Sequence, residues 1–182
     1  CMQRMSAIAT KTNYYKSLIA GTRAELLDTR KTTPNFRLLE KWAVLIGGGK
    51  NHRLGLFDMI MLKDNHIDMA GGISAAINRT KDYLRAINKK LPIEVETRTL
   101  SEVREVLKAG GVDIIMLDNM DLHTMREAVK LIGKQSRTEA SGGITEETIR
   151  PVADCGVDYI SVGALTHAVK SLDLSLKAGE GD

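Results

Sequence analysis

The chain has 182 residues, of which 43% are hydrophobic, 27% are charged and 4% are aromatic, and its formal net charge is +3 at pH 7. These values predict one medium-sized domain with a hydrophobic core, and the small charge and scarce aromatic residues argue against a nucleic-acid partner. No apolar run approaches the ~20 residues that cross a bilayer, so we expect no membrane partner. The two cysteines, Cys1 and Cys155, form neither a metal-binding spacing nor a disulfide framework, which favours a reduced, cytoplasmic setting.

The chain opens on a predicted helix, because Met5, Ile8, Ala9 and Thr12 share one helical face. That helix begins at residue 1 without a capping residue, so we expect further sequence before it. Residues 177–182 are polar and contain glycine, and we expect them to fray as a tail.

Strands and helices then alternate along the chain. The predicted strands are 25–28, 58–62, 93–96, 113–117, 137–140 and 158–162, and the predicted helices between them are 36–46, 73–87, 100–109, 122–132 and 146–153. Two similar segments, 109–113 and 154–158, each join a helix to the next strand through glycine. Repeated βα units favour parallel strands with helical crossovers. The sequence therefore predicts an α/β fold, a TIM-like (β/α) barrel formed by residues 1–176 as one domain.

Three short polar runs carry most of the candidate binding residues. They are 28–32, 47–53 and 63–66, and they contain Arg30, Lys31, His52, Arg53 and Lys63. Arginine offers a planar fork that fits a carboxylate or phosphate, and lysine adds a mobile point charge. The runs therefore indicate a pocket for a small polyanion, although three unrelated basic loops would give the same local pattern.

Polar residues also follow five successive predicted strands. Lys63, Glu96, Asp118, the Ser141-Gly-Gly143 turn and Gly163 each stand at or just past the end of an apolar run. In a barrel, the carboxyl ends of the strands meet at one rim, where active sites lie. Each residue alone could be solvated or could merely turn the chain, but the shared placement indicates a common site.

The last two of these turns predict a phosphate site. Ser141-Gly-Gly143 and Gly163-Ala-Leu-Thr-His167 expose backbone N–H groups near predicted helix starts, and barrels often bind phosphate after their last two strands. Glu96 and Asp118 could hold Mg²⁺, which commonly takes one or two carboxylates plus phosphate oxygens. They could equally accept hydrogen bonds from sugar hydroxyls.

Six segments together resemble one family. They are Asp28-Thr-Arg-Lys-Thr-Thr-Pro34, Gly47-Gly-Gly-Lys-Asn-His-Arg-Leu-Gly-Leu56, Leu62-Lys-Asp-Asn-His-Ile67, Met116-Leu-Asp-Asn119, Glu139-Ala-Ser-Gly-Gly-Ile144 and Gly156-Val-Asp-Tyr-Ile-Ser-Val-Gly-Ala-Leu-Thr-His167. The chain resembles the quinolinate phosphoribosyltransferases, also called nicotinate-nucleotide pyrophosphorylases (carboxylating), from about Met5 to Leu176. The resemblance implies an open α/β barrel, preceded in the family by an α/β sandwich domain that these residues lack.

The resemblance also implies a reaction. Family members are pentosyltransferases that join quinolinate to 5-phosphoribosyl-1-pyrophosphate, releasing CO₂ and diphosphate and giving nicotinate mononucleotide for NAD biosynthesis. A homodimer or higher homo-oligomer is expected, because the family's N-terminal part supplies an arginine to the partner subunit's site. Activity is therefore expected to need that part and a partner subunit.

Site roles follow from matching these motifs one residue at a time. Thr29, Arg30, His52, Arg53 and Lys63 would face the quinolinate carboxylates, Lys31 the diphosphate, Glu96 and Asp118 the ribose hydroxyls and Mg²⁺, and Ser141, Gly142, Gly143, Gly163 and His167 the 5′-phosphate. Within this set, the expected catalytic residues are Lys31, Lys63, Glu96 and Asp118.

Two alternatives stay open from the sequence. A molybdenum-linked homologue or a nicotinate phosphoribosyltransferase would keep the barrel and phosphate site but change the cations that bind carboxylates. A non-catalytic phosphate-binding module is the second alternative. The full set of Arg30, Arg53 and Lys63 favours a dicarboxylate substrate.

Overall fold

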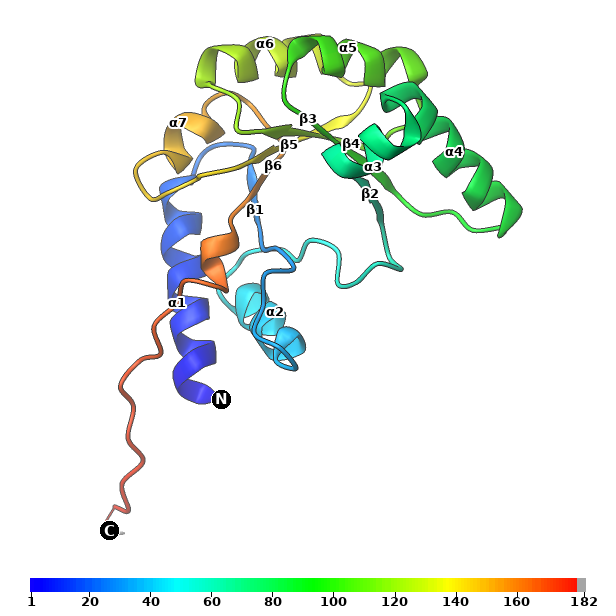
Figure 1. Cartoon of the computed structure of the whole chain (residues 1–182). Coiled ribbons are helices and arrows are strands. Elements are labelled where there is room, and N and C mark those ends of the chain that lie inside the picture. Colours follow the sequence, from blue (N-terminus) through cyan, green and yellow to red (C-terminus); the bar gives the residue numbers. More distant parts are fainter. Residues whose placement is uncertain (180–182) are drawn as a thin grey trace.

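A computed structural model describes residues 1–179 of the chain. Six parallel strands form one sheet in the order β1-β6-β5-β4-β3-β2 (Figure 1). The strands are β1 (Glu25–Leu27), β2 (Ile60–Leu62), β3 (Ile93–Thr97), β4 (Ile114–Asp118), β5 (Arg137–Ser141) and β6 (Tyr159–Ser161). The predicted α/β class and parallel strands are confirmed.

The helices cover the outer side of this sheet and its first edge. They are α1 (Met2–Leu18), α2 (Arg37–Ile46), α3 (Asp64–Ala70), α4 (Ile73–Ala86), α5 (Leu100–Ala109), α6 (Leu122–Ile132), α7 (Ile149–Ala153) and the 3₁₀ helix η1 (Gly163–Leu165). Figure 1 shows α4 to α7 arched over one face of the sheet, with α1 and α2 packed together near β1. Within residues 1–179, no helix is both long and apolar enough to span a bilayer.

The sheet curls into an open barrel, with β1 and β2 at its two edges. Beyond β1 the only further pairing in the described part of the chain is an isolated parallel bridge between Leu27 and Lys50. The barrel is therefore left open between that bridge and β2. The open, TIM-like barrel is confirmed.

The hydrophobic core lies between the sheet and its helices. Successive side chains of a strand point to opposite faces. Val95, Ile115 and Ile160 are fully buried in one apolar cluster with helix residues such as Ile77 and Val103. Burying each such side chain stabilises the fold by about 1.5–3 kcal/mol. The opposite face of the same strands is polar, and it forms the interior of the barrel.

The two similar segments at 109–113 and 154–158 make equivalent joints. Asp113 Oδ2 accepts the backbone N–H of Ile93 at 2.8 Å, and Asp158 Oδ2 accepts that of Thr138 at 2.8 Å. Asp113 thus precedes β4 and holds the start of β3, and Asp158 precedes β6 and holds the start of β5. These joints hold the strands in register, so that their carboxyl ends reach the same rim.

Some predicted boundaries were wrong, and each difference has a local cause. Helix α3 was not predicted: none of its residues is buried, so it shows no apolar periodicity. Asp58 was expected to start β2, but its carboxylate accepts the N–H groups of Leu54 and Gly55 and belongs to the preceding loop. Of the tail predicted at 177–182, residues 177–179 form neither helix nor strand and 180–182 lie outside the described residues.

Candidate active site

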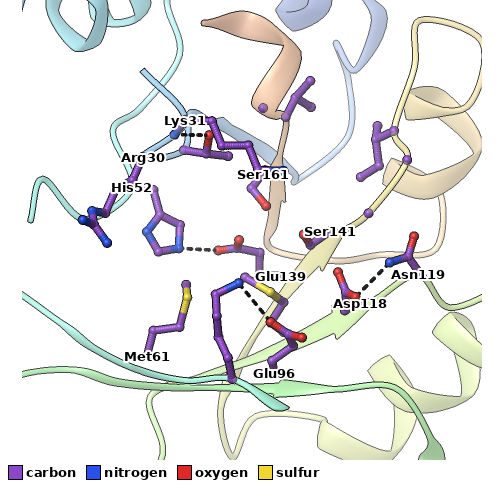
Figure 2. A pocket seen from close by; sticks show the side chains of 18 of the residues that line it. Arg30, Lys31, His52, Met61, Glu96, Asp118, Asn119, Glu139, Ser141 and Ser161 are labelled. Carbon is purple, nitrogen blue, oxygen red and sulfur yellow. Dashed lines mark hydrogen bonds and ion pairs between the residues drawn. The ribbon is translucent and has the colours of Figure 1, made fainter. Parts of the chain in front are cut away.

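A cavity of about 680 Å³ opens at the carboxyl ends of the strands. Figure 2 shows its lining side chains converging from the strand ends and the loops after β1 and α2. All thirteen predicted residues line it: Thr29, Arg30, Lys31, His52, Arg53, Lys63, Glu96, Asp118, Ser141, Gly142, Gly143, Gly163 and His167. The expectation that five strand ends share one rim is confirmed, while the role of each residue stays a prediction.

Arg30 and Arg53 bring two guanidinium groups close together at one end of the cavity. Burial lowers the pKa of Arg53, and the nearby charge of Arg30 lowers it further. The Nε of Arg30 is buried without a hydrogen-bond partner, and within residues 1–179 neither arginine forms an ion pair. Two unpaired cations held together in a partly buried site favour an anion with more than one negative group.

His52 lies deeper in the cavity against two carboxylates that were not predicted as site residues. Its Nε2 is 3.0 Å from Glu94 Oε2 and 3.4 Å from Glu139 Oε2, and both glutamates are fully buried. Figure 2 shows the imidazole of His52 facing the carboxylate of Glu139. Burial and the neighbouring Glu139 raise the pKa of Glu94 to about 7. The barrel interior therefore holds a compact group of titratable side chains.

The ligand atoms of this group lie within 4.8 Å of one another, close enough to surround a cation. Burial lowers the pKa of His52, whereas the carboxylates of Glu139 and Glu94 raise it. A charged imidazole would need a proton on Nδ1, yet Nδ1 accepts the Arg53 N–H at 2.7 Å. We therefore describe His52 as neutral, with its proton on Nε2. In that state Nε2 is a donor to the carboxylates and not a metal ligand.

This arrangement bears on the predicted role of His52. Inside the protein Nδ1 accepts the Arg53 N–H, and Nε2 lies beside the carboxylates of Glu94 and Glu139 without completing a hydrogen bond. His52 could donate to a quinolinate carboxylate only by giving up its contact with Glu94 and Glu139. The ring nonetheless lines the cavity and supports the backbone of Arg53.

Glu96 and Asp118 point into the cavity from the ends of the neighbouring strands β3 and β4. Glu96 Oε2 lies 3.2 Å from Lys63 Nζ, and Asp118 Oδ2 accepts from the side-chain amide of Asn119 at 2.8 Å. Lys63 thus contacts Glu96 at the rim, whereas the sequence predicted it beside the quinolinate carboxylates. Two carboxylates from adjacent strand ends are a donor set that fits Mg²⁺ when phosphate oxygens complete the shell.

Two neighbouring turns present unpaired backbone donors to the cavity. Across residues 1–179, the N–H groups of Gly142, Gly143, Gly163 and Ala164 form no hydrogen bond. Gly142 and Gly143 have φ angles of +94° and +57°, and a Cβ at position 142 would collide with the Asn119 amide. Glycine is therefore favoured at 142 for its backbone conformation, and a larger residue would also displace the Asn119 amide. Successive free N–H groups of this kind form an anion-binding concavity.

Lys31 and His167 lie on either side of the second of these turns. A Cβ at position 163 would come within 3.2 Å of Lys31 Cδ and 3.1 Å of His167 Nε2. Thr166 Oγ1 donates to the Lys31 carbonyl at 2.7 Å, which fastens the loop after β1 to the turn after β6. Two cationic or polar side chains thereby reach the group of free N–H donors.

Eight further lining residues received no predicted role. They are Met61, Met116, Asn119, Glu139, Ile144, Ser161, Val162 and Ala164. Strand alternation could have found two of the barrel's inner carboxylates, because Glu94 shares a face with Glu96 and Glu139 shares one with Ser141. Met61 and Met116 are apolar, so nothing in the sequence distinguishes them from core residues. They reach the cavity because the sheet curls into a barrel.

Comparison with known families gives a match along nearly the whole chain. The family model described as quinolinate phosphoribosyl transferase, C-terminal domain, matches residues 8–177. The chain is 52% identical over 190 aligned positions to the chloroplastic nicotinate-nucleotide pyrophosphorylase (carboxylating) of Arabidopsis thaliana, covering 97% of this chain and 54% of that protein. It is 47% identical to a probable nicotinate-nucleotide pyrophosphorylase of Bacillus subtilis, covering 96% of this chain and 59% of that protein.

Solved structures give the same result. NadC from Streptococcus pyogenes superposes with a TM-score of 0.90 at 46% identity, covering 97% of this chain and 60% of the other. The nicotinate-nucleotide pyrophosphorylase of Francisella tularensis gives a TM-score of 0.90 at 43% identity, covering 95% and 60%. The chain thus spans about half to three fifths of the length of these relatives.

Proposed function

Because the chain belongs to the quinolinate phosphoribosyltransferase family, we propose that the protein transfers a phosphoribosyl group from 5-phosphoribosyl-1-pyrophosphate to quinolinate. The products are nicotinate mononucleotide, CO₂ and diphosphate, and the reaction belongs to NAD biosynthesis. The observation that carries the proposal is that two guanidinium groups without an ion-pair partner in residues 1–179, those of Arg30 and Arg53, line the same cavity as the carboxylates of Glu96 and Asp118.

Quinolinate is a dicarboxylate, and it would bind at the Arg30 and Arg53 end. Each guanidinium can hold one carboxylate through a charge-assisted hydrogen-bond pair, and the mutual repulsion of the two cations is relieved when the dianion arrives. Thr29 and Lys63 also line the cavity and would complete this subsite, Lys63 by exchanging its contact with Glu96 for a substrate carboxylate. The ring nitrogen is then directed toward the ribose carbon that it attacks.

The sugar phosphate would occupy the other end. The free N–H groups of Gly142, Gly143 and Gly163, with Ser141 and His167, would hold the 5′-phosphate. Glu96 and Asp118 would accept the ribose hydroxyls, and their charge would stabilise the oxocarbenium-like transition state. Lys31 would reach the departing diphosphate. Bound Mg²⁺, held by Glu96 and Asp118, would neutralise charge on that diphosphate.

Decarboxylation follows from the chemistry of the transferred product. Once the ring nitrogen carries the ribose it is positively charged, so it stabilises the electron pair left on the adjacent ring carbon when its carboxylate departs as CO₂. That carbon then takes a proton from water, which gives the mononucleotide. Lys31, Lys63, Glu96 and Asp118 are the catalytic residues of this proposal. Arg30 and Arg53 keep the remaining carboxylate in place during the second step.

We also propose that the working protein is a homodimer or a higher homo-oligomer and that it acts in the cytoplasm. Sedimentation of the native protein tests the oligomeric state, and fractionation of the cells that make it tests the location. The names of the plant relatives place those proteins in chloroplasts or mitochondria, so an organellar location is the outcome that would overturn the second point.

A binding experiment tests the substrate assignment. The protein, in the form in which its cell makes it, is titrated calorimetrically with quinolinate, with nicotinate and with 5-phosphoribosyl-1-pyrophosphate plus Mg²⁺. We expect quinolinate to bind at least tenfold more tightly than nicotinate, because nicotinate leaves one guanidinium unpaired. Equal affinity for the two pyridines, or no affinity for the sugar phosphate, would overturn the proposal.

A further inference from the structure

One side of α2 carries three charged residues that do not touch the cavity. Arg37, Glu40 and Lys41 stand at the spacing i, i+3, i+4, which places them on the same face of a helix. Glu40 is fully buried and Lys41 is 3% exposed. Charged side chains are rarely buried unless they are paired, so Glu40 and Lys41 must have polar partners inside the protein.

Arg37 joins the two loops that carry the guanidinium groups. Its Nη2 donates to the backbone carbonyl of Arg30 at 3.3 Å, and its Nη1 donates to that of Leu54 at 3.2 Å. Its Nε donates to Thr32 Oγ1 at 2.9 Å. One side chain therefore fixes the backbone at Arg30 and directly after Arg53.

Lys41 holds the same two loops at Asp28 and His52, which precede Arg30 and Arg53 in the sequence. Its Nζ lies 2.5 Å from Asp28 Oδ1 and donates to the His52 carbonyl at 3.0 Å. Asp28 in turn accepts the His52 N–H at 2.8 Å and the Asn51 amide at 2.6 Å. The segments that lead into Arg30 and into Arg53 are thus held by one buried ion pair.

Glu40 connects the first loop to the turn after β6. It accepts the N–H and the hydroxyl of Thr33 at 3.1 and 2.9 Å, and the Nε of Arg4 at 3.0 Å. Arg4 also donates to the carbonyls of Thr166 at 2.5 Å and Val169 at 2.6 Å. The loop of Arg30 and Lys31 is therefore coupled to the turn that presents the free N–H donors.

From these contacts we propose that Arg37, Glu40 and Lys41 are positioning residues, and that this face of α2 sets the separation and orientation of Arg30 and Arg53. The inference rests on the proposed binding of a dicarboxylate by that pair. Matching two carboxylates needs both forks at a fixed spacing, and a misplacement of about 1 Å can cost ~10²-fold in rate. Binding of the sugar phosphate depends less on Arg37, because most of its proposed contacts come from the turns after β5 and β6 and only Lys31 lies on a loop that Arg37 holds.

The test uses Arg37→Met, which keeps an unbranched apolar stem and removes the guanidinium group with its three hydrogen bonds. Arg104→Met is the matched control, since Arg104 is exposed on α5 and lines no part of the cavity. In the native protein we expect Arg37→Met to weaken quinolinate binding roughly 10- to 100-fold, with a less than threefold change for 5-phosphoribosyl-1-pyrophosphate. Arg37→Lys, which restores the charge without the fork, should lie between Arg37→Met and the unchanged protein.

Each outcome separates the inference from the proposed function. If the unchanged protein fails to bind quinolinate, the proposed function fails. If it binds but Arg37→Met loses affinity for both ligands equally, or for neither, the positioning role is wrong. Should Arg37→Met not fold, Thr32→Val removes the acceptor of the Arg37 Nε, together with a long hydrogen bond of 3.5 Å from the Thr32 hydroxyl to the Arg30 carbonyl. This variant should shift the ratio of the two affinities in the same direction.

Discussion

At the scale of single residues, the site contains two arginine side chains, Arg30 and Arg53, that repel each other. It also contains two glutamate carboxylates, Glu94 and Glu139, that are buried away from water. Burial and the nearby charge of Arg30 lower the pKa of Arg53, and burial and the neighbouring Glu139 raise the pKa of Glu94 inside the barrel. Such an arrangement is costly in the empty protein. This electrostatic cost falls when a ligand of complementary charge binds. Groups with shifted pKa values therefore often mark functional sites.

The first prediction concerns the shape of the cations. Arg30→Lys and Arg53→Lys keep the charge but lose the planar fork, so each should weaken quinolinate binding by about 1.5–3 kcal/mol, or roughly ten- to hundredfold. Binding of the sugar phosphate should change little. Calorimetry with both ligands measures this, and a parallel loss for both would point to general damage to the fold.

A second prediction concerns the free N–H donors. Gly142→Ala should abolish binding of 5-phosphoribosyl-1-pyrophosphate, because the added Cβ collides with the Asn119 amide at the turn. Gly21→Ala is the matched control: Gly21 also has a positive φ, of +79°, but nothing lies within 4 Å of its Cβ position. Both variants should lose some thermal stability, and only Gly142→Ala should lose the phosphate ligand. Equal binding by the two would remove the phosphate assignment.

At the scale of elements, helix α2 was predicted from the sequence, but its contacts with the loops of Arg30 and Arg53 were not. The spacing of Phe36, Leu39, Ala43 and Ile46 predicted this helix, and its end at Gly47 was confirmed. The burial of Glu40 and Lys41 could not be predicted, because charged residues on a helix are usually solvated. Their partners, such as Asp28, His52 and Thr33, lie in the loops before and after α2, and the spacing along the chain does not show that these loops fold back onto it.

The third prediction tests the buried pair on α2. Lys41→Met leaves the Asp28 carboxylate buried without its cation, and should lower the free energy of unfolding by about 3–5 kcal/mol. The double variant Asp28→Asn/Lys41→Met should recover part of that loss, since no unpaired charge remains. Chemical denaturation measures both.

The control for that pair is Arg85→Met. Arg85 forms an exposed ion pair with Asp82 along one helix, and such pairs contribute at most about 1 kcal/mol. A loss for Lys41→Met no larger than that for Arg85→Met would show that the buried pair does not stabilise the loops.

At the scale of the whole molecule, most of the site could be predicted because a barrel brings all strand ends to one rim. Lys63, Glu96, Asp118, Ser141 and Gly163 were placed by that rule alone. The roles of other residues depend on distances across the barrel. The contact of His52 with Glu94 and Glu139 joins three distant segments, and no local pattern predicts such a meeting.

The most direct test of the central claim is turnover by the native protein. It is incubated with Mg²⁺, 5-phosphoribosyl-1-pyrophosphate and quinolinate labelled at the carboxylate next to the ring nitrogen, and the labelled CO₂ and the nucleotide are both quantified. We predict one CO₂ released for each nicotinate mononucleotide formed, and no such release when nicotinate replaces quinolinate. Formation of the mononucleotide from nicotinate in preference to quinolinate, or no turnover of quinolinate by the native protein, would contradict the account.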